Sequence, residues 1–190
     1  MAAGKIALVG LSRVRMFPVE QNDLEGYRVG DALSIPEIQG MSKSANVDSE
    51  TIFADDGIYM EITSWNGLEL ELTFAEMAHQ MVAALGFGEY DPMTKELKGR
   101  PQGSAKEFAL TFRAKLANGN YRMFRMYTFA VSEVGAASLQ TQGGGVNIAP
   151  YAIRGIVKRR AFDDEFFVEK DSESADELVW LESVPESPEA

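Results

Sequence analysis

The sequence predicts a mostly β fold: an antiparallel β-sandwich or open barrel of two sheets, with one flanking α-helix and a short C-terminal helix. Three observations lead to this class. Apolar and polar residues alternate along several runs, which is typical of strands that bury one face. Asn-Gly pairs, which favour tight turns, accompany these runs. Helical spacing is confined to short segments, and no alternation of strands and helices indicates a parallel sheet.

The chain has 190 residues, and 45% of them are hydrophobic. Chains of this length commonly form one domain whose core needs no metal or disulfide. We therefore expect a single domain over residues 1–190. Its end, 185–190, is rich in Pro, Glu and Ser, a composition that predicts a disordered tail.

The first fifty residues carry weak signals. The apolar run 16–19 contains Pro18, which predicts an edge strand or no strand. Residues 21–30 and 39–48 are polar and are expected to form loops. Residues 51–54 are a short strand candidate.

A β-hairpin is predicted over residues 58–74. Apolar side chains alternate along 58–62 and again along 68–74, and an Asn-Gly pair separates the two runs. Asn-Gly suits a type I′ turn because both central positions need positive φ, and Asp-Gly tolerates turn geometry for a similar reason. The predicted turn residues are Asp55, Asp56, Gly57, Asn66, Gly67, Asn118 and Gly119.

Residues 75–85 have helical spacing and end at a glycine, so they predict the flanking helix. Residues 86–104 then predict a long loop, which leaves room for a small hairpin. A second helix is expected over 175–184, with Trp180 as the anchor that docks it on the sheets, since an aromatic ring in an acidic segment is best explained by burial.

Two long strands are predicted at 108–116 and 121–131. The second carries apolar residues on both faces, which indicates a strand covered on both sides. Shorter strands are expected at 139–141, 146–148, 151–157 and 162–168. The triple glycine at 143–145 precedes a predicted strand and lacks the Lys-Ser/Thr of a phosphate loop, so it is interpreted as a hairpin tip.

Charge and composition exclude several function classes. The net charge is −11, which disfavours nucleic-acid readers and proteins of anionic membrane surfaces. There is no Cys and only one His, His79, and no Ser lies in a Gly-x-Ser-x-Gly elbow. No apolar run is long enough for a membrane span or a secretory signal, so we expect a protein made in the cytoplasm. No catalytic residue, metal ligand or cofactor is predicted.

Acidic and basic side chains form the most suggestive surface sets. In a hairpin that turns at Asn66-Gly67, Glu61, Glu69 and Glu71 project from the polar face, either as solvated side chains or as an acidic lining. Basic residues gather at 113–125 and 158–160. In an acidic chain such basic stretches commonly pair with the acidic surface of a neighbouring copy.

Several stretches in order resemble the major tail proteins of long-tailed, non-contractile phages. They are Thr51 to Gly57 before a Glu-bearing alternating run, Lys115 to Arg122, Tyr127, Leu139 to Gly143, Arg154-Gly155, Arg160, Asp163-Asp164 and Trp180. The resemblance extends from about Thr51 to Glu186, and the first 50 residues match only loosely. The order and spacing of these pieces carry the resemblance.

The resemblance implies a tail-tube fold and a structural virion protein rather than an enzyme. Such subunits form hexameric rings that stack into a tube in the tail of the virion, after assembly in the host cytoplasm. DNA passes through a negatively charged lumen, for which Glu61, Glu69 and Glu71 are the candidate lining. The partners implied are the tape-measure protein, the tail terminator and the distal tail protein, with no membrane.

Three alternatives remain open at the level of the sequence. The first is a tube protein of a contractile tail or a related injection device, which shares the architecture. The second is a monomeric small-molecule-binding β-barrel, which would carry an apolar pocket of ligand size. The third is an esterase-like enzyme, which the missing triad signals disfavour.

Overall fold

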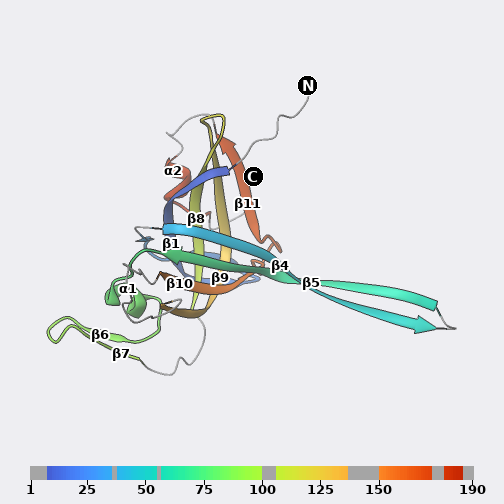
Figure 1. Ribbon diagram of the computed structural model, residues 1–190, viewed down its shortest axis with the longest axis horizontal. Helices are drawn as coiled ribbons and strands as arrows, with labels where there is room; N and C mark the ends of the chain where they lie inside the picture. Colours follow the sequence, from blue (N-terminus) through green and yellow to red (C-terminus); the bar gives the residue numbers. More distant parts are fainter. Residues whose placement is uncertain are drawn as a thin grey trace, which may run out of the picture.

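The computed structural model describes residues 8–35, 38–54, 57–99, 106–136, 150–172 and 178–185. These residues lie mostly in antiparallel strands with two short helices, which confirms the predicted class (Figure 1). The strands are β1 (Leu8–Asp23), β2 (Gly26–Val29), β3 (Leu33–Ser34), β4 (Ile38–Ala54), β5 (Gly57–Phe74), β6 (Glu89–Asp91), β7 (Glu96–Lys98), β8 (Glu107–Leu116), β9 (Tyr121–Ala136), β10 (Tyr151–Lys158) and β11 (Phe167–Ser172). The helices are α1 (His79–Ala84) and α2 (Leu178–Leu181).

Nine of the described strands form one hydrogen-bonded sheet in the order β2-β1-β8-β9-β10-β5-β4, with β3 beside β1 and β11 beside β9. The first part of β9 pairs with β11 and its second part with β10, both on the edge opposite β8. The sheet therefore divides along β9. Figure 1 shows β4, β5 and β10 running across the direction of β8 and β11, so the two predicted layers are portions of one bent sheet.

The main core lies where the two portions of the sheet face each other. Leu72 of β5, Phe108 and Phe112 of β8 and Ile153 of β10 belong to one cluster and are fully buried. The rings of Phe112 and Phe124 stack with their centroids 4.8 Å apart. The alternation along 68–74 and 108–116 predicted these inward positions, because successive side chains of a strand point to opposite faces.

A second, smaller cluster covers the other face of β8 and β9. Phe17, Tyr27, Tyr127 and Val184 belong to it. The hydroxyl of Thr111 donates a hydrogen bond of 2.7 Å to the carbonyl of Leu181 and so ties α2 to β8. The prediction that the strand at 121–131 is covered on both sides is confirmed.

The predicted hairpin turn at Asn66-Gly67 is wrong, because both residues lie inside the continuous strand β5. The hairpin is instead formed by β4 and β5 along their whole lengths, so the polar stretch predicted as the loop 39–48 is a strand. Gly57 is the first residue of β5. Asp55 and Asp56, predicted as turn residues, lie outside the described residues.

A bulge explains why the Asn-Gly pair occurs within a strand. Asn46 of β4 faces Gly67, whereas the next residue, Val47, faces Trp65, so Asn66 is the extra residue. Gly67 has φ 119°, a conformation that side chains rarely adopt. A Cβ at this position would lie 2.5 Å from the carbonyl oxygen of Val157 on β10. The glycine therefore serves the bulge and the close approach of two strands rather than a turn.

Several other expected boundaries also change. Residues 21–30 are not a loop, because β1 continues to Asp23 and pairs with β2. Pro18 lies within β1, opposite Phe108 of β8, and β1 is an inner strand of the sheet. The small hairpin allowed for in 86–104 exists as β6 and β7. The triple glycine and the strands expected at 139–141 and 146–148 lie outside the described residues.

Both helices and the last strand differ in extent from their predictions. The flanking helix begins at His79 rather than at residue 75, because the backbone of Ala78 is extended. No side chain caps this end of the helix. The last strand is β11, at 167–172 rather than 162–168, and Phe162 lies in the turn before it. Helix α2 is one short turn that contains Trp180. The turn predicted at Asn118-Gly119 joins β8 to β9, with φ 93° at Gly119.

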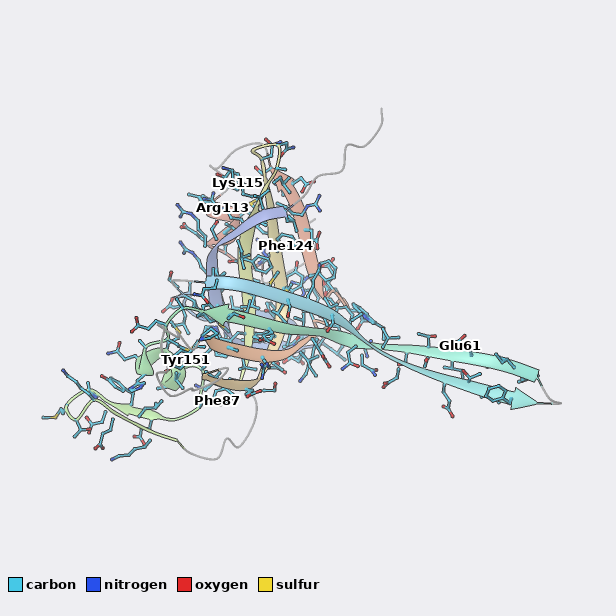
Figure 2. The ribbon with its side chains drawn as sticks, in the orientation of Figure 1. Glu61, Phe87, Arg113, Lys115, Phe124 and Tyr151 are labelled. Atoms are coloured by element: carbon cyan, nitrogen blue, oxygen red, sulfur yellow. The ribbon has the colours of Figure 1, made fainter. Side chains whose placement is uncertain are left out.

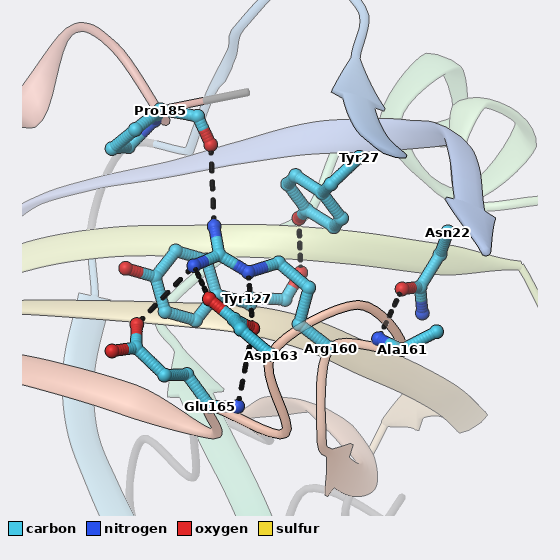
Figure 3. A network of polar contacts seen from close by, with 8 residues as sticks. All are labelled: Asn22, Tyr27, Tyr127, Arg160, Ala161, Asp163, Glu165 and Pro185. Carbon is cyan, nitrogen blue, oxygen red and sulfur yellow. Dashed lines mark hydrogen bonds and ion pairs between the residues drawn. The ribbon is translucent and has the colours of Figure 1, made fainter. Parts of the chain in front are cut away.

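A buried arginine holds the end of the described chain against the sheet (Figure 3). The side chain of Arg160 is 2% exposed. Its guanidinium donates hydrogen bonds to both carboxylate oxygens of Asp163, to Glu165 at 3.2 Å and to the carbonyl of Pro185 at 3.3 Å. It also lies 3.8 Å from the centre of the Tyr127 ring. Arg160 thus joins three segments that are distant in sequence.

Two further hydrogen bonds complete this network. The hydroxyl of Tyr27 donates to the backbone carbonyl of Tyr127, and the backbone N–H of Ala161 donates to the side-chain oxygen of Asn22 at 2.8 Å. The end of β1 is thereby fixed to the loop that follows β10, and the start of β2 to β9. Satisfied buried polar networks of this kind favour one arrangement of the chain.

The ion pair of Arg160 and Asp163 predicts a loss of stability in acid. The hydrogen bond from the guanidinium lowers the pKa of Asp163, and burial opposes this with a smaller effect. A carboxyl group whose pKa is lowered by folding contributes fully above its unfolded pKa of about 3.9, and this contribution disappears as the pH falls through the lower folded value. We expect Asp163→Asn to be less stable than the parent chain above about pH 5, with a difference that shrinks towards zero below about pH 4.

The measurement is urea unfolding of both chains across this pH range. The control is Asp164→Asn, which changes the neighbouring carboxylate; the Asp164 side chain is 71% exposed. Asparagine also tolerates the positive φ at this position. A difference between parent and Asp163→Asn that is constant with pH would contradict the proposed ion-pair contribution.

Candidate functional site

The outer parts of β4 and β5 form a two-stranded arm that extends away from the rest of the molecule (Figure 1). We define the arm as residues 47–54 and 57–66. On the body side, β5 pairs with β10 only from Leu68 to Phe74. Beyond this point each strand of the arm has a single described neighbour, the other strand. Isolated two-stranded ribbons are marginally stable in water, so the arm lacks the support that strands usually have.

The arm exposes large apolar side chains. Phe53, Ile58 and Tyr59 expose 69%, 70% and 71% of their surface. The exposed large apolar residues of the arm are Val47, Ile52, Phe53, Ile58, Tyr59, Met60, Ile62 and Trp65. Continuous apolar exposure on this scale marks an interaction surface in a folded protein.

Both long edges of the arm also have backbone groups without a strand partner in the described structure. β4 is the last strand of the sheet, and the outer half of β5 is not paired with β10. Unpaired N–H and C=O groups along a strand form a template for pairing with another chain. At the base, the ring of Trp65 packs on Phe166 with 4.2 Å between centroids, which fixes the arm to the body.

The arm is acidic throughout. The sequence between Val47 and Trp65 contains no Lys or Arg. It contains five acidic residues: Asp48, Glu50, Asp55, Asp56 and Glu61. The described acids of this set are exposed. A surface that combines apolar side chains with one sign of charge selects partners of the opposite charge.

The predicted acidic lining does not form one group. Glu69 and Glu71 lie on the outer face of β5, but the bulge at Asn66 shifts the alternation, so Glu61 shares the face that carries Leu68. Figure 2 shows Glu61 on the arm, separated from the body. The sequence could not separate these residues, because the bulge looks like an ordinary turn signal.

Glu69 and Glu71 lie in a polar region of the body. Arg154 of β10 donates to Glu71 at 3.1 Å and to Glu133 of β9 at 3.0 Å, and these hydrogen bonds to the two carboxylates raise the pKa of Arg154. Asn46 donates to Glu69 at 3.3 Å. A depression of about 320 Å³ on this face is lined mainly by polar residues: Ser42, Ser44, Glu69, Leu70, Glu71, Ser132, Arg154, Gly155 and Ile156.

This face therefore carries alternating charges rather than a continuous negative surface. Lys158 pairs with Glu107 at 3.1 Å on the same side of the sheet. Serine hydroxyls and paired ions make such a surface hydrophilic. A ligand pocket is usually lined mainly by apolar and aromatic groups, whereas this depression has no aromatic residue and only Leu70 and Ile156 as large apolar ones.

Trp180 contacts the sheet through the side chain of Arg125 on β9. Its ring covers the guanidinium of Arg125 at 4.0 Å, and its carbonyl accepts a hydrogen bond of 2.9 Å from the same side chain. Arg125 also donates to the carbonyl of Ser183 at 3.0 Å. Trp180 is half-buried. The sequence predicts Arg125 to lie in a basic surface stretch, but its side chain is buried and anchors α2.

His79, the single histidine, is the first residue of α1 and lies 6.3 Å from Tyr90 between ring centres. Among the described residues, no three His, Cys, Asp or Glu side chains come together as metal ligands. No helix in the described part of the chain is long and apolar enough to cross a membrane.

No protein-family model matches this sequence, and a search of the curated proteins finds no significant match.

Proposed function

We propose that this chain is a self-assembling structural subunit of a phage tail tube. The observation that carries the proposal is the arm, a two-stranded ribbon with uncovered apolar side chains and unpaired edges. Several stretches of the sequence resemble major tail proteins in their order and spacing, and this resemblance supports a tail tube as the assembly. The subunit would act by forming rings that stack into a tube in the virion tail.

The arm supplies a driving force for assembly. Burial of apolar surface contributes roughly 25 cal/mol per Å², so covering its large side chains outweighs the ordering of a few residues. A second copy also offers strand edges of the same kind. Contacts of different surfaces on identical copies produce rings when the rotation closes and filaments when it does not.

The channel wall of such a tube would carry Glu69 and Glu71. They line the mainly polar depression on the body, beside Ser42, Ser44 and Ser132. DNA carries about one negative charge per 1.7 Å of its axis, and unpaired cations on the wall would bind it. In our proposal Arg154 keeps its charge directed at Glu71 and Glu133 and does not bind phosphate. In this arrangement Glu61 belongs to the arm and not to the channel wall. The partners expected are the tape-measure, terminator and distal tail proteins.

The test removes apolar surface from the arm without touching the core. Phe53 and Ile58 face each other across the two strands and are both exposed. We expect Phe53→Ser with Ile58→Ser to leave the melting temperature of the isolated chain within a few degrees, because surface changes usually alter stability by less than about 0.5 kcal/mol. Assembly should require a concentration at least about tenfold higher, as measured by light scattering.

The matched control is Met93→Ser, which removes another exposed apolar side chain, 92% exposed, from the turn between β6 and β7. It should assemble like the parent chain. If the arm variant assembles at the same concentration as Met93→Ser, the arm does not drive assembly.

A further inference from the structure

Two neighbouring cations on β8 lack a carboxylate partner within the described chain. Most other described cations have one. The pairs include Arg15 with Glu182, Lys43 with Glu169, Arg122 with Asp171, Arg154 with Glu71, Lys158 with Glu107 and Arg160 with Asp163. Arg113 and Lys115 form no ion pair among the described residues, although acidic residues number 29 and Lys and Arg together only 18.

Arg113 and Lys115 are two residues apart on one strand, so they share the face of β8 that points away from the main core. Arg113 donates to the hydroxyl of Ser12 at 3.3 Å, and its guanidinium lies 4.3 Å from the centre of the Tyr121 ring. Lys115 is exposed beside Tyr121, its partner on β9. Figure 2 shows both cations at the same end of the body. Like charges placed this closely repel each other, and an external carboxylate would relieve the repulsion.

Exposed apolar side chains border these cations. Leu8 and Val9 begin β1 and expose 55% and 66% of their surface. Leu8 faces Leu116, and the next glycine of β1, Gly10, faces Lys115. We call Leu8, Val9, Arg113, Lys115 and Tyr121 the basic end.

The arm has the complementary composition. Asp48 and Glu50 lie two residues apart on β4, so they share one face of the ribbon; both are exposed and form no ion pair among the described residues. Glu50 faces the exposed Ile62 across the ribbon. Both surfaces therefore combine uncovered apolar groups with unpaired charge, and the charges have opposite sign.

The acidic arm of a molecule cannot contact the basic end of the same molecule. Figure 2 shows Glu61 on the extended arm and Arg113 and Lys115 on a separate part of the body. The complementary surfaces of one molecule point to different places. Such a pair of surfaces suits a head-to-tail contact between copies, which can continue from subunit to subunit.

We propose that the arm of one copy docks on the basic end of a second copy, with Asp48 and Glu50 beside Arg113 and Lys115. This inference rests on the proposed self-assembly and names the surface that receives the arm. The apolar side chains of both surfaces are then covered together, and the acidic residues make the contact specific.

Reciprocal charge reversal tests the pairing. One variant carries Asp48→Lys with Glu50→Lys, and the other carries Arg113→Glu with Lys115→Glu. Each should raise the concentration needed for assembly by about tenfold or more, because like charges then meet across the contact. An equimolar mixture of the two should assemble near the concentration of the parent chain, since the reversed arm fits the reversed end. Light scattering and electron microscopy measure both outcomes.

Lys95→Glu is the control, because it makes the charge change of Lys115→Glu at the β6–β7 turn, and it should assemble like the parent. If Arg113→Glu impairs folding, as judged by circular dichroism, Lys115→Glu alone replaces it in the mixture. Two results would overturn the pairing if the parent chain assembles. In the first, both variants assemble like the parent; in the second, their mixture does not assemble. A parent chain that never assembles would overturn the proposed function as well.

Discussion

Arg160→Ala is expected to lower the free energy of unfolding by about 3–5 kcal/mol, the usual effect of breaking a buried ion pair. The guanidinium is almost fully buried and serves Asp163, Glu165 and the carbonyl of Pro185. Its removal leaves these acceptors without their donor and opens space beside the Tyr127 ring. Chemical denaturation monitored by tryptophan fluorescence and circular dichroism gives the difference.

Two comparisons separate burial from charge. Arg159→Ala removes the neighbouring arginine, whose side chain is 67% exposed, and should change stability by less than about 0.5 kcal/mol. Arg160→Lys keeps the charge but loses the planar, bidentate geometry, so it should resemble Arg160→Ala more than the parent. Equal melting temperatures for the Arg159 and Arg160 alanine variants would show that the network does not stabilise the fold.

Gly67→Ala is the second change with a large expected effect. The new Cβ would lie 2.5 Å from the carbonyl oxygen of Val157, and the backbone at φ 119° is unfavourable for alanine. Both problems involve backbone atoms, so no side chain can rotate away. We expect a loss of about 2 kcal/mol or more, since strained backbone positions contribute roughly 1–3 kcal/mol each.

Gly40→Ala provides the matched control on the partner strand. A Cβ at Gly40 would have nothing within 4 Å, and Gly40 is not among the glycines with positive φ. This variant should be as stable as the parent or slightly more stable, because alanine restricts the unfolded chain. If the two alanine variants unfold at the same denaturant concentration, the bulge at Asn66 tolerates a side chain and our account of Gly67 fails.

The strands of the core are predictable from sequence because burial leaves a clear pattern. Along 68–74 and 108–116 the inward positions are apolar and the intervening ones mostly polar, and the structure buries the inward residues. The arm has a similar alternation at 58–62, yet Ile58, Met60 and Ile62 are exposed. Alternation indicates that one face of a strand prefers to be buried, but it does not show whether residues of the same chain cover that face.

Turn and charge signals in the sequence are ambiguous for a different reason. Asn66-Gly67 has the composition of a hairpin turn, but the same positive φ also serves a bulge, and only the pairing with β4 and β10 distinguishes them. The basic triplet at 158–160 looks like one surface patch. In the structure Lys158 pairs with Glu107, Arg159 is exposed and Arg160 is buried among aromatic rings. Partners distant in sequence decide these outcomes.

Electron microscopy of the purified whole chain over a rising concentration series tests the central claim most directly. We expect monomers at low concentration and rings or hollow tubes of uniform diameter at high concentration, because the arm then binds a second copy. The Phe53→Ser, Ile58→Ser variant at the same concentrations should remain monomeric. Monomers alone at every concentration of the parent chain, or only irregular aggregates, would contradict a tube-forming subunit.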